Sequence, residues 1–154
     1  GDILMQRGIM LASAESCTGG WIGQTITAIA GSSRWYERGF ITYSNLSKQE
    51  MLGVDERLLN KFGAVSEQIA LEMAAGAIAH SHAQLSIAVT GIAGPGGATE
   101  GKPVGMICHG WAIKDGSVKS ALCLLEGDRE SIRRQAVAIA LQGAIDLLHE
   151  EINT

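Results

Sequence analysis

The fold of this chain is decided by residues 9–20, which read IMLASAESCTGG. Residues 9–14 form a short apolar run with the length of a buried strand. Residues 15–20 are polar and rich in glycine. After them, Ile22, Ile26 and Ile29 recur at helical spacing, and Gly31 is placed to end that helix. The stretch therefore predicts a strand that turns directly into a helix, with Ser16 in the turn.

The same patterns predict the remaining elements. Strands are expected at 35–44, 85–90, 104–113 and 118–125, and helices at 3–8, 47–52, 55–62, 66–81 and 128–151. A turn at Asp115-Gly116 joins the last two strands as an antiparallel hairpin. Helices therefore come before, between and after the strands.

In two of these helices, the spacing of the apolar residues indicates which face is buried. Ser66 can cap the helix over 66–81. One stripe of that helix carries Ile69, Met73, Ala77 and His80. In the closing helix, the residues expected to face inward are Ile132, Ala136, Ile139, Ala140 and Ile145. We expect both helices to pack on the sheet.

These elements predict one α/β domain over residues 1–154. Its expected architecture is a three-layer α/β/α sandwich with a mixed, mostly parallel sheet and an antiparallel hairpin. Ligands of such sheets bind beyond the carboxyl ends of the strands. The turns after Ala14, Tyr43 and Thr90 are therefore the places to look for chemistry.

Composition excludes several classes of protein. The formal net charge of −4 argues against a nucleic-acid partner, although a few local donors can still hold a small anion. No run reaches the ~18 apolar residues of a membrane span, and we expect a cytoplasmic protein with no membrane partner. Cys17, Cys108 and Cys123 have no paired spacing, so no metal site is expected.

Ser16 is the first candidate for catalysis. Backbone N–H groups of Cys17, Thr18, Gly19 and Gly20, at the start of a helix, suit an anion or a developing oxyanion. A serine in such a turn resembles a nucleophile elbow in position, although the G-x-S-x-G pattern is absent. The alternative is that Ser16 or Thr18 merely caps the helix, and the two roles are compatible.

A serine nucleophile needs a base, and none of the four histidines is well placed for a triad. Ser-Lys enzymes instead use a lysine whose pKa burial lowers. Tyr43 and Lys48, at the end of the second strand, offer such a pair. The alternative is an ordinary solvated lysine on a short helix and an aromatic residue at the rim of the sheet.

A glycine-rich loop follows Thr90 and could expose N–H groups to a phosphate or carboxylate. It could equally be a tight connection between buried strands. Residues 96–102 approach a P-loop, but Pro103 stands where the magnesium-binding hydroxyl belongs and a strand follows, which argues against a nucleoside triphosphatase. Arg129 and Arg133 could form a two-pronged anion clamp or simply a solvated helix face.

Together these motifs resemble the CinA C-terminal domain family. The matching stretches run from 14–20 through Tyr43-Ser44-Asn45, Lys48 and 90–97 to Val104-Gly105 and the helix start at 127–133. The resemblance covers nearly the whole chain, from about residue 3 to about residue 148. Stand-alone members of this family are nicotinamide-nucleotide amidohydrolases.

The resemblance implies hydrolysis of nicotinamide mononucleotide to nicotinate mononucleotide and ammonia, without a cofactor, in pyridine nucleotide recycling. It implies Ser16 as nucleophile and Tyr43 and Lys48 as the residues that move protons. The residues expected to bind the substrate are Cys17, Thr18, Gly19, Gly20, Asn45, Thr90, Gly91, Gly94, Gly96, Gly97, Arg129 and Arg133.

Two other functions stay open at this point: a non-catalytic module that binds a mononucleotide, and an amidase for another small carboxamide. The glycine-rich loop suits the first of these, but a binding module leaves Ser16, Tyr43 and Lys48 unexplained. We also expect a homo-oligomer, because Trp21 and Trp35 could lie at the surface.

Overall fold

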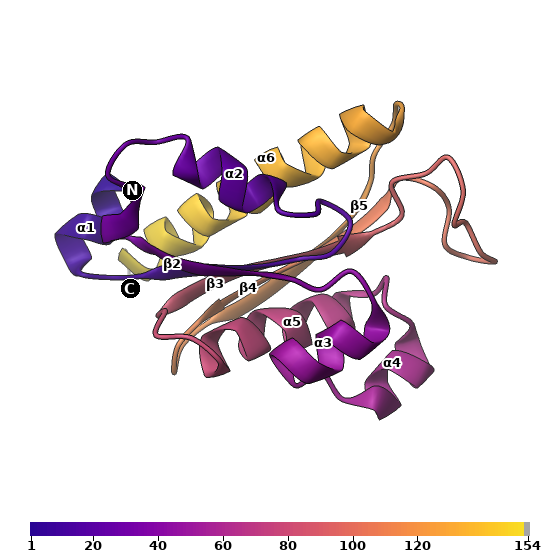
Figure 1. The fold of residues 1–154 in the computed structure, drawn as a ribbon, viewed down its shortest axis with the longest axis horizontal. Coiled ribbons are helices and arrows are strands. Elements are labelled where there is room, and N and C mark those ends of the chain that lie inside the picture. Colours follow the sequence, from indigo (N-terminus) through magenta and orange to yellow (C-terminus); the bar gives the residue numbers. More distant parts are fainter. Residues whose placement is uncertain (153–154) are drawn as a thin grey trace.

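The computed structural model describes residues 1–152 and contains one five-stranded sheet between two layers of helices (Figure 1). Its strands are β1 (Leu11–Glu15), β2 (Tyr36–Ile41), β3 (Leu85–Gly91), β4 (Met106–Ile113) and β5 (Val118–Leu124). Their order across the sheet is β2-β1-β3-β4-β5. β1 is parallel to both β2 and β3, whereas β4 is antiparallel to β3 and β5. Four strands therefore run one way and β4 the other, which confirms the mixed sheet and the hairpin.

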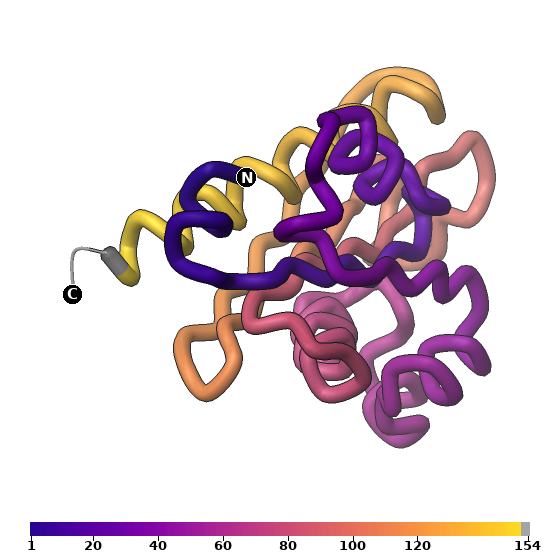
Figure 2. Tube along the Cα trace, turned by 60° about the vertical axis from the view of Figure 1, so that its left-hand side comes forward, coloured from indigo at the N-terminus to yellow at the C-terminus, as the bar shows by residue number. Residues whose placement is uncertain are grey.

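The helices cover both faces of the sheet (Figure 1). One layer contains α1 (Asp2–Arg7), α2 (Trp21–Thr27) and α6 (Arg129–Ile152). The other contains α3 (Asn45–Leu52), α4 (Glu56–Phe62) and α5 (Glu67–Ala79). Figure 2 shows α1 beside the C-terminal half of α6, so the two ends of the chain support each other. The predicted three-layer α/β/α sandwich is confirmed.

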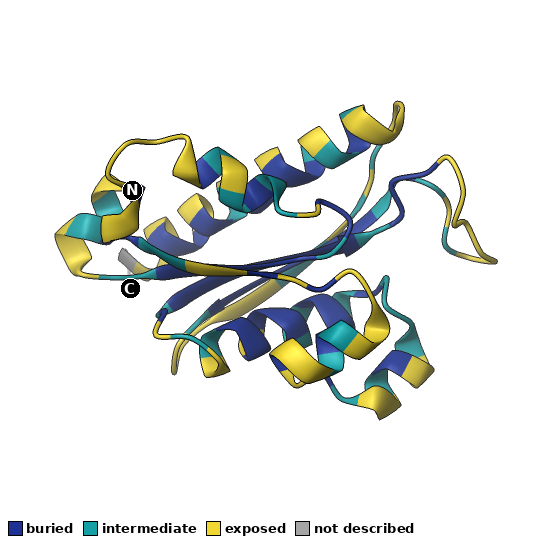
Figure 3. Ribbon diagram, viewed as in Figure 1, coloured by how far each residue is buried: buried dark blue, intermediate teal, exposed yellow. Residues whose placement is uncertain are grey.

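Side chains that point alternately to the two faces of the sheet build two hydrophobic cores, one on each face. In β3, Leu85, Ile87 and Val89 pack toward α2 and α6, while Ala88 packs toward α5. β1 follows the same rule, with Leu11 on the first side and Ala12 on the second. Both faces of these strands are buried, which explains why they read as unbroken apolar runs (Figure 3).

Small residues on the α5 side of the sheet let that helix approach closely. Gly110 of β4 is the extreme case, because a Cβ there would lie 2.4 Å from the Ala70 carbonyl oxygen of α5. Ser66 caps α5 as predicted, its hydroxyl accepting from the Ile69 N–H at 3.3 Å. His80 ends the helix and is exposed, so it does not share the buried stripe as predicted.

The prediction for the helix after Ser16 was wrong at its end. α2 stops at Thr27, before the predicted end at Gly31, and Ile29 is 56% exposed. The hydroxyls of Thr25 and Thr27 donate to carbonyl oxygens of the preceding turn, at 2.8 and 2.7 Å. Gly31 instead precedes a short 3₁₀ turn over Ser32–Arg34.

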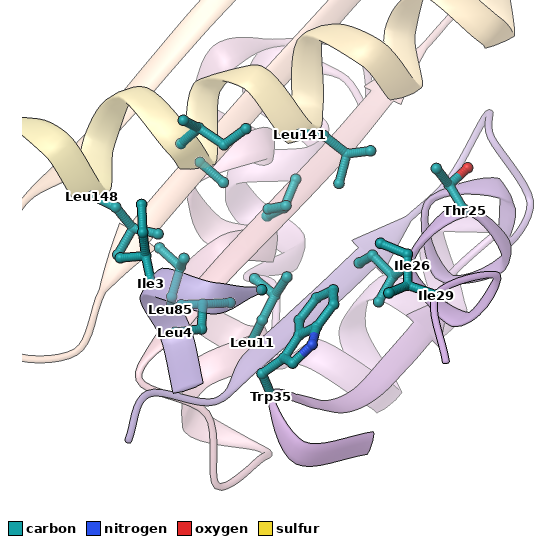
Figure 4. Close-up of a pocket in the computed structure, with 14 residues that line it drawn as sticks. Ile3, Leu4, Leu11, Thr25, Ile26, Ile29, Trp35, Leu85, Leu141 and Leu148 are labelled. Atoms are coloured by element: carbon teal, nitrogen blue, oxygen red, sulfur yellow. The ribbon is translucent and has the colours of Figure 1, made fainter. Parts of the chain in front are cut away.

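The closing helix was placed correctly, but its inward face is narrower than predicted. Ile132, Ala136 and Ala140 are buried, whereas Ile139 is half-buried and Ile145 is 43% exposed. Ile145 borders an apolar cavity of about 210 Å³ between α1, α2 and α6 (Figure 4). Leu11 and Leu85, which begin β1 and β3, line this cavity, so it lies at the end of the sheet opposite Ser16.

Candidate active site

The carboxyl ends of three parallel strands converge on Ser16. Ser16 follows β1 directly, and its N–H donates to the Val89 carbonyl of β3 at 3.0 Å. On the other side, the Thr42 N–H, just beyond β2, donates to the Glu15 carbonyl at 2.8 Å. Ser16 is thus held between two neighbouring strands at the edge where such sheets bind ligands.

Lys48 reaches this serine from α3. Its Nζ lies 3.0 Å from Ser16 Oγ and donates to the Thr42 carbonyl at 2.8 Å. A capping box between Ser44 and Ser47 starts α3 and fixes the helix that carries Lys48. The lysine is 2% exposed, so the predicted alternative of a solvated lysine is wrong.

Burial changes the acid–base chemistry of this lysine. Removal from water disfavours the ammonium and lowers the pKa of Lys48 from 10.5 to about 8, against a smaller opposing effect of Cys17. About a tenth of Lys48 is therefore neutral at about pH 7, far more than for an ordinary lysine. A neutral amine at hydrogen-bond distance from a hydroxyl has the geometry of a nucleophile and its general base.

Cys17, the neighbour of Ser16, has the opposite property. It is 6% exposed, and burial raises the pKa of its thiol to about 12. Because the thiolate is the nucleophilic form, this cysteine is poorly suited to attack a carbonyl. The microenvironment favours the serine over the cysteine.

Tyr43 and Arg129 form a second group. Tyr43 is 63% exposed, and its hydroxyl accepts a hydrogen bond from Arg129 Nη2 at 3.1 Å. Arg129 Nη1 donates to the Gly94 carbonyl at 2.7 Å, which ties the last helix to the glycine-rich loop. Within residues 1–152, no hydrogen bond joins Tyr43 to Ser16 or Lys48. The structure therefore brings Ser16 and Lys48 together and places Tyr43 with Arg129.

Arg133 has different partners from Arg129. Its Nε and Nη2 donate to the carbonyls of Cys17 and Thr18, each at 3.0 Å, and its guanidinium lies 5.3 Å from the Trp21 ring. Two nitrogen atoms of this guanidinium therefore donate to the turn that carries Ser16. Arg133 thus supports the turn, while Arg129 faces Tyr43 and the loop.

Sequence reasoning missed Glu15 as a member of this site. Glu15 is 2% exposed, and its carboxylate accepts from the Thr18 hydroxyl and from the N–H groups of Gly20, Ile22 and Gly23. The available signal was a carboxylate just before the start of a helix, where negative charge is stabilised.

This arrangement narrows the set of N–H groups open to a ligand. Gly20 donates to Glu15, and Gly19 donates to the Ser16 carbonyl at 3.1 Å. The N–H groups of Cys17 and Thr18 donate neither to Glu15 nor to a backbone carbonyl within the described chain. The predicted oxyanion donors over 17–20 therefore reduce to two.

The glycine-rich loop projects beyond the sheet between β3 and β4 (Figure 1). Thr90 is buried, and its hydroxyl donates to the Ala64 carbonyl at 2.9 Å. Gly91 ends β3 and Gly94 is buried, while Gly96 and Gly97 are exposed. Asn45, the first residue of α3, is also exposed. The accessible part of the loop is thus its tip.

A groove of about 480 Å³ lies between this loop and α4. Gly97, Thr99 and Lys102 line one wall, and Lys61 and Phe62 line the other. Lys102 donates to the Phe62 carbonyl, so its ammonium joins the two walls and does not act as a P-loop lysine.

Residues 1–152 contain neither a cluster of metal ligands nor a membrane-spanning helix. In the described part of the chain, no group of three or more His, Cys, Asp or Glu side chains is placed to hold a metal ion. Nor is any helix over residues 1–152 long and apolar enough to cross a membrane.

Comparison with known proteins adds a family to this geometry. The CinA C-terminal domain model matches residues 1–148. A protein from Enterobacter agglomerans, named nicotinamide-nucleotide amidohydrolase PncC, is 50% identical over 94% of this chain and 88% of its own. The protein of that name from Escherichia coli (strain K12) is 49% identical over 92% of this chain and 86% of its own. A CinA-like protein from Akkermansia muciniphila is 44% identical, but the match spans only 36% of it.

Solved structures agree with the sequence relatives. The competence/damage inducible protein CihA from Agrobacterium tumefaciens is 45% identical, with a TM-score of 0.88 over 96% of each chain. A CinA superfamily protein from Escherichia coli is 37% identical, with a TM-score of 0.91 over 95% of this chain and 84% of its own. Both the sequence and the fold therefore point to the same set of proteins.

Proposed function

Because the chain belongs to the CinA C-terminal domain family, we propose that it hydrolyses nicotinamide mononucleotide to nicotinate mononucleotide and ammonia. The names of the amidohydrolase relatives supply the substrate, and these relatives match over most of their own length. The observation that carries the proposal is the 3.0 Å contact between Ser16 Oγ and the buried Lys48 Nζ. We propose that residues 1–154 act as one catalytic domain, although residues 153–154 lie outside the described part.

The first half of the reaction is acylation. Neutral Lys48 takes the Ser16 proton as Oγ attacks the carboxamide carbon, and the carbonyl oxygen becomes an oxyanion. The N–H groups of Cys17 and Thr18 stabilise that oxyanion, a contribution of about 3 kcal/mol for each donor in comparable sites. The C–N bond then breaks, and the proton held by Lys48 passes to the departing nitrogen, which leaves as ammonia.

The second half is hydrolysis of the ester on Ser16. Water loses a proton to Lys48 as it attacks the acyl carbon, and the proton returns to Ser16 Oγ when the ester bond breaks. Tyr43 assists these proton transfers from the rim of the site, where Arg129 orients its hydroxyl. The Thr42 carbonyl keeps Lys48 directed at the serine throughout.

The phosphate of the substrate is proposed to bind at the tip of the glycine-rich loop, near Gly96 and Gly97. Arg129 supplies the positive charge, since it already bridges Tyr43 and the Gly94 carbonyl at this place. Asn45, exposed at the start of α3, is proposed to bind the substrate too, whereas the buried Thr90, whose hydroxyl donates to the Ala64 carbonyl, would act by holding the loop. Holding the remote phosphate would orient the carboxamide toward Ser16.

The two rival functions predict different measurements. A mononucleotide-binding module leaves the Ser16–Lys48 contact without a role, and ligand binding without ammonia release would support it. An amidase for another substrate would release ammonia from a different small carboxamide.

Ammonia release from nicotinamide mononucleotide tests the proposal directly. We expect turnover by the unaltered protein and none measurable for Ser16→Ala or Lys48→Ala. Thermal unfolding of each variant checks that the fold survives. No ammonia from the unaltered protein, despite measurable binding, would favour the binding module. Fractionation of cells tests the expected cytoplasmic location.

A further inference from the structure

A buried carboxylate lies directly behind the proposed nucleophile. Glu15 precedes Ser16 in the chain and is 2% exposed, yet the four ion pairs among described residues do not include it. Its Oε1 accepts from Thr18 Oγ1 at 2.6 Å and from the N–H groups of Gly20 and Ile22 at 3.2 and 2.9 Å. Its Oε2 accepts from the Gly23 N–H at 3.0 Å.

These bonds close the turn that displays the serine. Gly20, the N-cap of α2, has a φ of 105°, and no side chain of its own caps the helix. Glu15 reaches forward from the end of β1 and supplies that cap instead. The end of β1 and the start of α2 are thereby joined through the Glu15 side chain, and Ser16 lies between them.

The backbone around Ser16 is fixed from the other side as well. Arg133 donates to the carbonyls of Cys17 and Thr18, so the turn's acceptors bind a guanidinium while its donors bind a carboxylate. The N–H groups of Cys17 and Thr18 are the donors of this turn that bind neither Glu15 nor a backbone carbonyl of the described chain. The division of hydrogen bonds thus determines which groups face a substrate.

We propose that Glu15 is a positioning residue for Ser16: it locks the turn so that Ser16 Oγ faces Lys48 and the Cys17 and Thr18 N–H groups stay open for the oxyanion. The proposal rests on the function proposed above. It also implies that the start of α2 does not hold the substrate's phosphate, because Glu15 already occupies that place. The phosphate then binds on the Arg129 side.

Glu15 is not proposed as a general base. Both of its oxygens accept hydrogen bonds inside the turn, and Ser16 Oγ has its contact with Lys48. A purely structural helix cap is the remaining alternative. That role would affect the free energy of unfolding but leave the reactivity of Ser16 in folded protein unchanged.

Glu15→Gln separates these roles. The glutamine keeps the length of the side chain, but it turns one acceptor oxygen into a donor that faces an N–H group. We expect kcat for ammonia release to fall about 10- to 100-fold, with KM within about twofold, because a misplaced nucleophile loses that much rate. Glu67→Gln is the matched control, since Glu67 also opens a helix and accepts from the Ser120 hydroxyl outside the site.

A second readout does not depend on the substrate. A sulfonyl fluoride labels an activated serine, and mass spectrometry of the Ser16 peptide gives the labelling rate. We expect this rate to fall with kcat in Glu15→Gln and to stay at the unaltered value in Glu67→Gln. If the unaltered protein releases no ammonia, the proposed function fails, but the labelling rates still test Glu15.

If Glu15→Gln fails to fold, a third variant can replace it in the test. Thr18→Val removes only the 2.6 Å hydrogen bond to Glu15, and we expect a smaller loss of labelling in folded protein. Folded Glu15→Gln with the labelling rate and kcat of the unaltered protein would overturn the proposal. If only Thr18→Val folds, an unchanged labelling rate there would overturn it.

Discussion

At the scale of the residue, the account depends on the protonation of Lys48. Its Nζ is buried beside Ser16 Oγ, where water cannot stabilise the ammonium. The sequence predicted this pairing through a family resemblance. It could not show the burial, because Lys48 lies on a short helix in which half of the residues are exposed.

The pH dependence of the reaction follows from this burial. With the pKa of Lys48 lowered to about 8, the base is protonated and inactive well below that pH and neutral above it. We expect kcat/KM to rise with pH through about 8 and then level off. A rate that is flat from about pH 6.5 to about pH 9.5 would contradict the role of Lys48.

A second buried base affects stability instead of rate. His109 in β4 is fully buried, its Nε2 lies 2.9 Å from the Ala136 carbonyl of α6, and burial lowers its pKa. Below the ordinary histidine pKa of 6.5, the unfolded chain binds a proton that the folded protein excludes. Stability is therefore complete above about pH 6.5 and falls as the pH drops toward the folded pKa.

Urea unfolding at about pH 7.5 and about pH 5.5 measures this effect. We expect His109 to account for a loss of up to about 1.4 kcal/mol at the lower pH. His109→Gln keeps a donor for the Ala136 carbonyl but does not titrate, so its stability should depend less on pH. An equal pH dependence in both proteins would exclude His109 as the cause.

At the scale of the element, the fit of α5 against the sheet explains why small residues line one face. That fit was only partly visible in the sequence, which predicted α5 and its cap but not which strand it touches. The end of α2 was missed because the hydroxyls of Thr25 and Thr27 bind carbonyls of the preceding turn. Glu15 was missed because most of its partners are backbone N–H groups, which leave no mark in a side-chain pattern.

Gly110→Ala tests the close approach of α5. The added Cβ would lie 2.4 Å from the Ala70 carbonyl oxygen, so helix or strand must shift. We expect a loss of about 1–3 kcal/mol in the free energy of unfolding. Gly96→Ala is the control, because nothing lies within 4 Å of its Cβ, and its effect should stay within about 0.5 kcal/mol. Equal stabilities would show that the layers are more loosely packed than described.

At the scale of the whole molecule, the prediction of a homo-oligomer needs another basis than the tryptophans. Trp35 is 6% exposed and Trp21 lies beneath Arg133. The outer strand β5 instead exposes Val118, Leu122 and Leu124 by 64%, 45% and 66%. Antiparallel pairing of two β5 strands about Ala121 would place Val118 opposite Leu124 and no like charges opposite each other.

The oligomeric state is measured by light scattering after size exclusion. We expect a dimer, and a monomer for Leu122→Lys with Leu124→Lys, because the added charges would lie opposite Ser120 and Val118 of the other copy and would lose water without gaining a partner. A dimer that survives both substitutions would show that another surface joins the copies. A monomeric unaltered protein would end the prediction.

The central claim is that Ser16 becomes acylated with Lys48 as its base. Rapid quenching of the protein with nicotinamide mononucleotide, followed by mass spectrometry of the peptide over residues 9–20, tests it most directly. We predict the nicotinoyl nucleotide adduct on Ser16 in the unaltered protein and its absence in Lys48→Ala. An adduct on Cys17, or an undiminished adduct in Lys48→Ala, would contradict the account.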